Sequence, residues 1–434
     1  MFKWRRRNDT LSVRLGASMR PDGAPVEKCV PGFSVVTFVL ILLIASLVAI
    51  ISRRFKVSYS VGLVVAGIVI AVLPSGVEIP LTRDLIFNVF LPPLVFEAAM
   101  QLRWKPFWRD LRLTAVLAFP GVALAAVVVA AGMHFVLGWQ WMGAALFGVL
   151  IAATDPVSVI ATFKEIGVDR RLSGIVEAES LLNDGAAAVG FALLMVVAAG
   201  GSLSPLSIST LLLWSVSGGV LAGVVVAGAS LVIAGRTTDH LVEITLTTVA
   251  AYGSFLLAEH FQASGVLASL TAGLMVGNLG WKRAICEGGR VHVLAFWEYA
   301  AFLANSFVFI LIGEQEAHAG NQLFSRAALA AIVFVLLGRA IAVYPLCLAF
   351  ARSSLALPLS HQHVLFWGGL RGALALALVL ALPDSMPQRS EIVMTAFAVV
   401  AFSIFIQGIT MPLLVRRLGL LEACIDEREP SAAD

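Results

Sequence analysis

Charged side chains are scarce in this sequence. Only 13% of its 434 residues are Asp, Glu, Lys or Arg, whereas soluble domains contain about a quarter. Because 59% of the residues are hydrophobic, water cannot be the main solvent of the folded chain. Apolar stretches of about 20 residues recur from Phe33 onward, which is the length of a helix that crosses a bilayer, whereas barrel strands need about half that length. The sequence therefore predicts an all-α integral membrane protein.

Cysteine and clustered basic charge are also rare. The chain has four cysteines that lie far apart without CxxC spacing: Cys29, Cys286, Cys347 and Cys424. They indicate neither a metal site nor a disulfide framework. The formal net charge is only +3, and the basic residues lie between the apolar stretches, so no nucleic-acid partner is expected. The polar tail of residues 1–32 lacks the apolar region and cleavage site of a signal peptide, and Met19 is an alternative start.

About thirteen transmembrane helices can be placed along the chain. We expect them near residues 33–52, 59–74, 84–101, 113–136, 141–163, 172–198, 208–234, 241–259, 263–279, 295–314, 324–350, 360–382 and 391–415.

Lys and Arg residues predict the orientation of these helices. Eighteen follow the odd-numbered helices, namely Arg53, Arg54, Lys56, Arg103, Lys105, Arg109, Arg112, Lys164, Arg170, Arg171, Arg236, Lys282, Arg283, Arg290, Arg352, Arg416, Arg417 and Arg428. Only Arg83, Arg326 and Arg389 follow the even-numbered ones. The positive-inside rule therefore places the odd loops and the C-terminus in the cytoplasm. It leaves the N-terminus outside, against the seven basic residues of its tail; the later loops dominate, the chain starts at Met19, or one span is miscounted.

Nine charged residues fall inside the predicted helices or at their ends. Each costs about 2.5 to 3.5 kcal/mol at mid-helix, so a deep one is a functional candidate. They are Glu97, Asp155, Glu177, Glu179, Asp184, Glu243, Glu298, Arg339 and Arg371. Of these, Glu243 and Glu298 begin their helices, and we expect them at the membrane interface.

The fifth predicted helix carries Thr154, Asp155 and Pro156 halfway along its length. Proline removes a backbone donor and clashes with the preceding turn, so we expect the helix to break there and free backbone carbonyls. Carbonyl, hydroxyl and carboxylate oxygens together suit a hard cation. The alternative is a plain proline kink with a capping Thr-Asp pair.

The sixth predicted helix carries two polar pairs at a spacing of four. Ser180 with Asp184, and Glu179 with Asn183, project to one flank of the helix. Such a cluster inside a membrane needs positive or ionic partners.

Two arginines supply positive charge, Arg339 in the eleventh helix and Arg371 between glycines in the twelfth. Glycine lowers helix propensity by about 1 kcal/mol, so we expect the twelfth helix to unwind as well. Interrupted helices at corresponding places in two halves indicate an inverted-repeat transporter. If the two cross, Asp155 could neutralise the half-helix N-termini and Arg371 the C-termini, leaving Arg339 for Glu179. Swapping the two arginines remains open.

Glu97 ends the string LPPLVFE in the third predicted helix, about one turn from its cytoplasmic end. It is either part of the polar cluster or a residue that extends to the interface.

Five strings resemble the NhaP and NHE type of sodium/proton antiporters, in the order of that family: LPPLVFEAA, AATDPVSVIATFKE, VEAESLLNDGAA, ASGVLASLTAGLMVGN and WGGLRGALALAL. The resemblance covers residues 33 to 417. It implies that Asp184 binds the cation and carries the proton, with Thr154, Ser180 and, through water, Glu97 as fellow ligands. Asn183 and Asp155 would support them, and Glu179 would form a structural ion pair, most plausibly with Arg339.

The resemblance also implies a homodimer in which a core domain moves against a dimerisation domain. The expected divisions are 1–32 as a tail, 33–107 and 237–322 as the dimerisation domain, 108–200 and 323–417 as the core transport domain, 201–236 as a linker helix, and 418–434 as a short cytoplasmic tail. A tail of that length leaves no room for a regulatory domain.

The predicted function is exchange of Na⁺ for H⁺ at a cell (inner) membrane, without a resident cofactor. Cation and proton compete for Asp184 because a ligating carboxylate must be deprotonated. Asn183 stands where electrogenic relatives of the fold carry a second acid, so we expect electroneutral exchange. Li⁺ or K⁺ would suit the same oxygens, and a K⁺-selective exchanger stays open. A channel would need a selectivity filter and a hydrolase a nucleophile with its base, and the sequence shows neither, so we expect no enzyme.

Overall fold

Helices make up nearly all regular structure in the computed structural model, which describes residues 35–55, 58–72, 85–201, 204–319 and 325–421. Within these ranges the only bridge joins Val168 to Leu421. The all-α prediction is confirmed. The predicted N-terminal tail and residues 422–434 lie outside the described residues. The helices are α1 (Val35–Phe55), α2 (Tyr59–Val72), the π-helical turn η1 (Ile86–Phe90), α4 (Leu91–Gln101), α5 (Trp104–Leu137), α6 (Trp141–Leu150), α7 (Val157–Ile166), α8 (Arg170–Ala198), α9 (Pro205–Ala234), α10 (His240–His260), α11 (Gly265–Met275), η2 (Val276–Gly280), α12 (Trp281–Arg283), α13 (Glu287–Ala319), α14 (Arg326–Ala349), α15 (Leu359–Trp367), α16 (Ala373–Leu380), α17 (Arg389–Phe402), η4 (Ser403–Gly408) and α18 (Ile409–Arg417).

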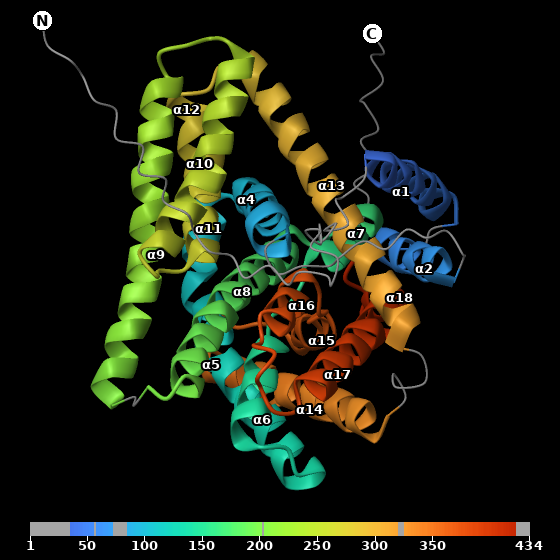
Figure 1. Cartoon of the computed structure of the whole chain (residues 1–434). Helices are drawn as coiled ribbons and strands as arrows, with labels where there is room; N and C mark the ends of the chain where they lie inside the picture. Colours follow the sequence, from blue (N-terminus) through green and yellow to red (C-terminus); the bar gives the residue numbers. More distant parts are fainter. Residues whose placement is uncertain (1–34, 56–57, 73–84, 202–203, 320–324, 422–434) are drawn as a thin grey trace, which may run out of the picture.

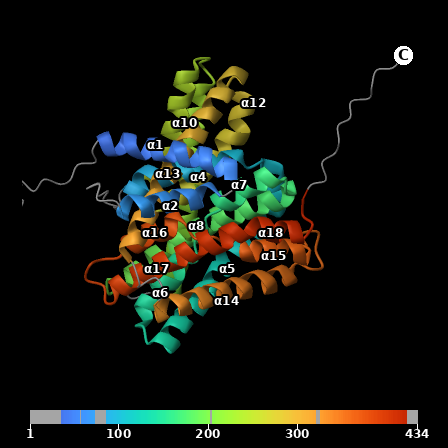
Figure 2. The same ribbon diagram turned by 90° about the vertical axis from the view of Figure 1, so that its right-hand side faces the viewer.

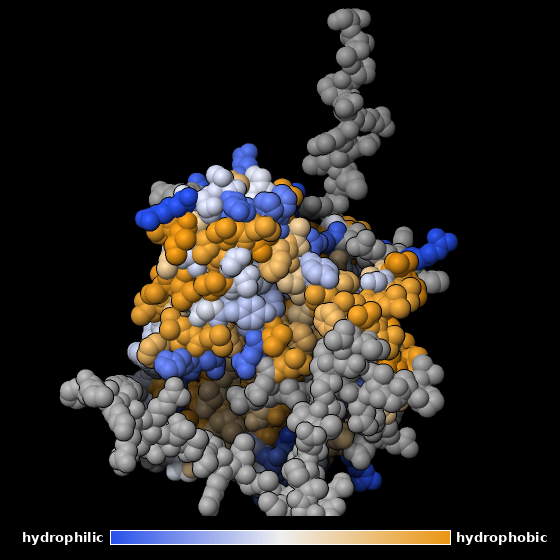
Figure 3. Space-filling view, turned by 45° about the horizontal axis from the view of Figure 1, so that its top comes forward, coloured by the Kyte–Doolittle hydropathy of each residue, from blue (hydrophilic) through white to orange (hydrophobic). Residues whose placement is uncertain are grey.

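Each of the thirteen predicted ranges coincides with one helix or with consecutive helical pieces. Seven helical stretches in the described residues are long and apolar enough to cross a membrane, by length and composition. That all thirteen cross stays a prediction. Figure 3 shows apolar side chains spread over much of one face of the molecule, with hydrophilic residues gathered at its edge.

Two helices begin earlier than predicted. Helix α5 starts at Trp104 rather than near residue 113, and α13 starts at Glu287 rather than near residue 295. The added turns contain charged residues, among them Lys105, Arg109 and Arg290. Hydropathy marks the part of a helix that lipid can cover, whereas the backbone hydrogen bonds continue beyond that part, so the prediction stopped short.

Two of the predicted helices are interrupted where the sequence indicated. The chain leaves helical conformation between Leu150 and Val157, which separates α6 from α7, and between Trp367 and Ala373, which separates α15 from α16. The two unwound segments touch, because the backbone N–H of Asp155 donates to the carbonyl of Leu370 at 2.7 Å. That the interrupted helices cross each other stays a prediction.

The helices form two groups, and α13 runs from one to the other with α2 packed along it (Figures 1 and 2). Helices α9, α10 and α11 pack together at one end, whereas α5, α6, α14 and the pieces α15 to α18 lie at the other. Helix α13 packs along α2 at close range: a Cβ on Gly67 would collide with the carbonyl of Ile310, and one on Gly313 with the carbonyl of Val64. Small residues permit such close packing inside a membrane.

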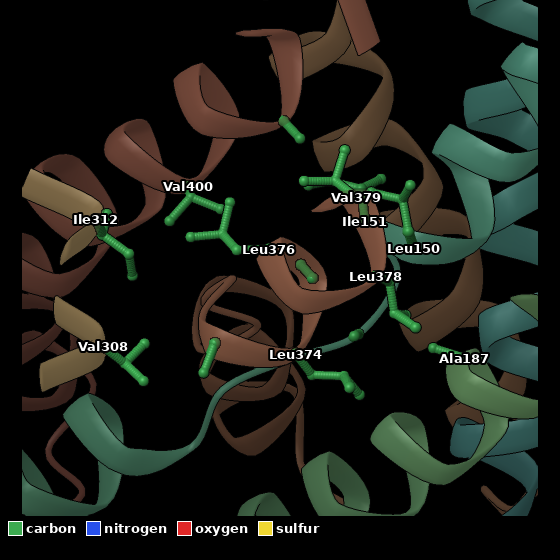
Figure 4. Packing of buried hydrophobic residues seen from close by; sticks show 14 of the residues in the cluster. Leu150, Ile151, Ala187, Val308, Ile312, Leu374, Leu376, Leu378, Val379 and Val400 are labelled. Atoms are coloured by element: carbon green, nitrogen blue, oxygen red, sulfur yellow. The ribbon is translucent and has the colours of Figure 1, made fainter. Parts of the chain in front are cut away.

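The half-helix α16 lies in the middle of the largest apolar cluster. Its sequence ALALALVL is apolar all round, as expected for a helix that is surrounded by protein. On one side Leu376 meets Val400 of α17, with Val308 and Ile312 of α13 beyond them, and on the other Leu378 approaches Ala187 of α8 (Figure 4). The unwound segment that precedes α16 is therefore held in the interior of the molecule.

Candidate functional site

The carboxylate of Asp155 lies at the start of two half-helices. Its Oδ1 accepts a hydrogen bond from the N–H of Val157, the first residue of α7, at 2.9 Å. Gly372, which directly precedes α16, packs so closely on the same carboxylate that a Cβ there would collide with Oδ2. Helix N-termini carry partial positive charge, so one carboxylate stabilises both ends.

Arg371 lies at the C-terminal end of α6, the first half of the first broken helix. Its Nη1 donates to the carbonyls of Ala152 and Ala153 at 3.0 and 3.1 Å, just beyond the last turn of α6. Its own backbone N–H donates to the hydroxyl of Ser403 at 3.0 Å. The guanidinium therefore satisfies carbonyls that the break leaves without helical partners.

Arg339 and Glu179 form a buried, bidentate ion pair. Nη1 and Nη2 of Arg339 lie 2.6 and 2.9 Å from the two carboxylate oxygens of Glu179. Nη2 also donates to the carbonyl of Leu365 in α15 at 2.9 Å. The sequence left open which arginine faces Glu179; in the structure Arg339 does, and each arginine contacts carbonyls of a different broken helix.

A hydrogen-bond network connects the polar residues of α8 to the first break. The amide of Asn183 donates to Oγ1 of Thr154 at 2.9 Å and to the carboxylate of Glu179. The hydroxyl of Thr154 donates in turn to Oγ of Ser180 at 3.2 Å. Asp184 lies beside Thr154 in the lining of one cavity, and its Oδ1 is buried without a partner.

A cavity of about 40 Å³ opens next to this carboxylate. Thr154, Asp155 and Asp184 line one side, Asn305 of α13 contributes another polar group, and the remaining lining is apolar. A water molecule or an ion of similar size fits such a volume. The spare oxygen of Asp184 beside a small cavity with several polar lining residues is the arrangement expected of a small-cation site, in which oxygen ligands replace water.

Glu97 lies apart from this cavity. The α4 residues that line it are Leu91, Leu94, Val95 and Ala98. Glu97 accepts a hydrogen bond from the side-chain amide of Gln101. The Oε1 of the same amide accepts a hydrogen bond from Nζ of Lys164 at 2.9 Å. Gln101 and Lys164 border a second, larger cavity of about 660 Å³, together with Glu177 and several arginines. Glu97 therefore lines neither cavity, but its hydrogen-bond partner Gln101 lines the larger one.

Sequence reasoning missed two contributors to the site. Asn305 and Ser403 are uncharged, so a search for intramembrane charges passed over them; buried polar residues in apolar helices would have been the signal. Glu243 lies in the first turn of α10, where it is buried by other helices and accepts a hydrogen bond from the backbone N–H of Cys286 at 3.0 Å; its depth at the membrane interface stays a prediction. Glu298 is exposed.

Known proteins resemble this chain over most of its length. Residues 39–417 match the family described as "Sodium/hydrogen exchanger, transmembrane". The Na(+)/H(+) antiporter ApNhaP of Aphanothece halophytica is 36% identical over 380 residues, which are 87% of this chain and 73% of that protein. The Na(+)/H(+) antiporter NhaH of Halobacillus aidingensis is 32% identical over 403 residues, which are 89% of this chain and 98% of that protein.

A solved structure shares the fold. The sodium proton antiporter MjNhaP1 from Methanocaldococcus jannaschii, determined at pH 8, superposes with a TM-score of 0.71. The match covers 88% of this chain and 98% of that chain, at 19% sequence identity. At this identity the likeness concerns the arrangement of the helices.

Proposed function

Because this chain belongs to the sodium/hydrogen exchanger family, we propose that it exchanges Na⁺ for H⁺ across the membrane in which its helices are embedded. It is then a transporter rather than an enzyme, and Na⁺ and H⁺ are its substrates. The observation that carries the proposal is the unpartnered, buried Oδ1 of Asp184, a residue that lines a small cavity together with Thr154, Asp155 and Asn305. No resident cofactor enters the mechanism.

Cation and proton compete for Asp184 in this proposal. A carboxylate must be deprotonated to coordinate a cation, so cation binding displaces the proton and acid weakens cation binding. Thr154, which lines the same cavity, supplies a second oxygen, and Ser180 and Asn183 fix its orientation through their hydrogen bonds. Glu97 lies outside the cavity, so its predicted contribution would pass through water.

The remaining charges hold the broken helices in place. Asp155 stabilises the N-termini of α7 and α16. Arg371 satisfies two carbonyls just beyond the end of α6, and Arg339 satisfies one carbonyl in α15. Glu179 compensates the charge of Arg339. These groups have partners already, which leaves Asp184 as the site's titrating group. One such group per cycle supports exchange of one cation for one proton, without net charge movement.

Alternating access would come from movement of one part of the chain against the other. We assign residues 108–200 and 323–417 to a core transport domain and residues 33–107 and 237–322 to a dimerisation domain, with 201–236 as the linker and a homodimer as the working unit. The asymmetry of basic loop residues supports a cell-membrane protein whose C-terminus is cytoplasmic and whose N-terminus is outside. The 660 Å³ cavity lined by Lys164 and Arg171 would then face the cytoplasm.

The direct test uses purified protein in lipid vesicles with a pH-sensitive dye. Addition of Na⁺ should relieve an imposed proton gradient, and parallel additions of Li⁺ and K⁺ determine selectivity, including the K⁺-selective alternative. Clamping the membrane potential should leave the rate unchanged if exchange is electroneutral. Vesicles that show no cation-dependent pH change, or that carry single-channel currents, would contradict the proposal.

A further inference from the structure

Glu316, near the C-terminal end of α13, is a buried acid without a partner. Its side chain is 3% exposed, and neither carboxylate oxygen has a hydrogen-bond partner. None of the ion pairs among the described residues includes it. A buried, unpaired carboxylate is among the costliest groups a protein interior can hold, so this one calls for a chemical explanation.

Helical geometry places Glu316 on the same face of α13 as the cation cavity. Asn305 lines that cavity, Ile312 follows seven residues later, and Glu316 follows after eleven. At 3.6 residues per turn, positions separated by seven and eleven residues share one face. Eleven residues rise about 16 Å along the axis, so Glu316 lies roughly three turns from the cavity, toward the end of α13 that the loop charges place outside.

This face of α13 lies against the core. Val308 and Ile312 are on the side of α13 that faces Leu376 of α16 and Val400 of α17 (Figure 4). We call this boundary the outer seam: the surface of α13 from Asn305 to Glu316, where it faces α16 and α17. In the proposed mechanism the two sides of this seam belong to the parts that move against each other.

Among the side chains that the structure describes, charged groups on the helices around α13 are engaged elsewhere or exposed. Helix α2 and η1 carry none, and Arg54 of α1 is exposed. The others have partners: Glu97 of α4 with Gln101, Glu243 of α10 with Cys286, Glu259 of α10 with Gly265, Glu391 of α17 with Trp139, and Arg389 of α17 with Leu382 and Asp384. On α10, His240 stacks on His292 of α13, and His260 meets Phe261 edge to face. Glu314, which precedes Glu316 by two residues, is itself engaged.

A proton is the ligand that fits this environment. A hard monovalent cation requires several oxygen ligands, and no neighbouring polar group in the described structure forms a hydrogen bond with Glu316. A proton needs only the carboxylate, and it removes the charge whose burial is costly. A proton bound to Glu316 would leave the side chain neutral while the outer seam is closed as it is here.

We propose that Glu316 is a second proton-binding group of the exchanger, which takes up and releases its proton on the outer side as the outer seam closes and opens. The proposal rests on the proposed function. When the outer seam opens and water enters, the carboxylate ionises and places a negative charge at the outer opening. Because its proton enters and leaves on the same side, the exchange of one cation for one proton is unchanged.

Infrared difference spectroscopy tests the protonation state without transport. The wild type at pH 7 should show the absorption band of a protonated carboxylic acid, and Glu316→Gln should lose one component of it. Glu298→Gln, which alters an exposed acid on the same helix, is the matched control and should keep the band. Glu316→Leu is a second variant that should fold, because an apolar side chain suits the buried position. A spectrum of Glu316→Gln identical to that of the wild type would overturn the proposal.

Transport in oriented vesicles tests the role. With Asp184 intact, Glu316→Gln should still exchange Na⁺ for H⁺, but its exchange rate should depend less steeply on outer pH. The apparent number of protons in that pH dependence should fall from about two to about one. The dependence on inner pH should stay as in the wild type. Equal outer profiles for the variant and the wild type would contradict the proposal, as would complete loss of exchange. If the wild type shows no exchange, the proposed function fails, while the infrared result still decides the proton site.

Discussion

The two unwound segments solve the same backbone problem with opposite charges. The first, residues 151–156, contributes Asp155, which reaches the start of α16 next to the second break. The second, residues 368–372, contributes Arg371, which reaches the carbonyls of Ala152 and Ala153 in the first break. Each break is therefore stabilised by a side chain from the other. Neither half-helix pair has its polar groups satisfied alone, which explains why both must be brought together in the folded chain.

A second comparison separates two carboxylates on the same helix. Glu179 is fully engaged, by two nitrogens of Arg339 and by the amide of Asn183. Asp184 keeps one buried oxygen without a partner. We therefore propose that the region around Glu179 and the arginines is structural, and that the free oxygen of Asp184 is the ligand used in transport. The predictions below test this division.

Asp184→Asn should have the largest effect on transport and a small effect on folding. Asparagine keeps the size of the side chain but can neither ionise nor carry a proton, so cation-dependent pH changes should fall to the level of vesicles without protein. The thermal unfolding midpoint should stay close to that of the wild type, since no engaged charge is removed. Vigorous exchange by this variant would show that Asp184 is not the titrating group.

Arg339→Ala should have the largest effect on stability. The substitution leaves the buried carboxylate of Glu179 without the guanidinium and the carbonyl of Leu365 without its donor. Breaking a buried ion pair costs about 3 to 5 kcal/mol. The yield of monodisperse protein and its unfolding temperature should both fall. The double variant Arg339→Met with Glu179→Leu is the control, and it should recover part of the loss because no lone charge remains. A double variant as unstable as the single one would show that the pair does more than neutralise charge.

The sequence predicted the parts of this site that follow from the chemistry of membrane interiors. Glu179, Ser180, Asn183 and Asp184 share a helix flank at a fixed spacing, and a proline predicts a broken helix by itself. The family resemblance is confirmed by the match over residues 39–417. The helix ends at Trp104 and Glu287 were missed because hydropathy does not sense backbone hydrogen bonds in solvated turns.

The partners of each charge could not be predicted in the same way. Which arginine meets Glu179 depends on how α14 and α15 pack against α8, and no local pattern encodes such a contact between distant segments. The hydrogen bond between Glu243 and Cys286 and the position of Asn305 in the cavity lining also depend on packing between distant segments. The unpartnered state of Glu316 could only be found once its neighbours were known.

Thr154→Val should weaken cation binding by a moderate amount. Valine preserves the shape of the side chain but removes the hydroxyl that lines the cavity and meets Asn183 and Ser180. Loss of one neutral hydrogen-bonding group is worth about 1 kcal/mol, so the cation concentration for half-maximal exchange should rise about fivefold to tenfold. That concentration should rise further as pH falls, in the variant as in the wild type, because protons compete for Asp184. Ser180→Ala, outside the cavity lining, should have a smaller effect.

Glu97→Gln should have the smallest effect of the four. Glu97 hydrogen-bonds to Gln101, outside the cavity lining, and an uncharged isostere can keep that contact, so the half-maximal cation concentration should change less than about threefold. Vesicle exchange measured beside Thr154→Val provides the scale. A loss as severe as that of Asp184→Asn would mean that Glu97 joins the cation in another conformation. The division between a self-contained site at Asp184 and supporting charges elsewhere would then fail, because an acid outside the cavity lining would be as necessary as Asp184 itself.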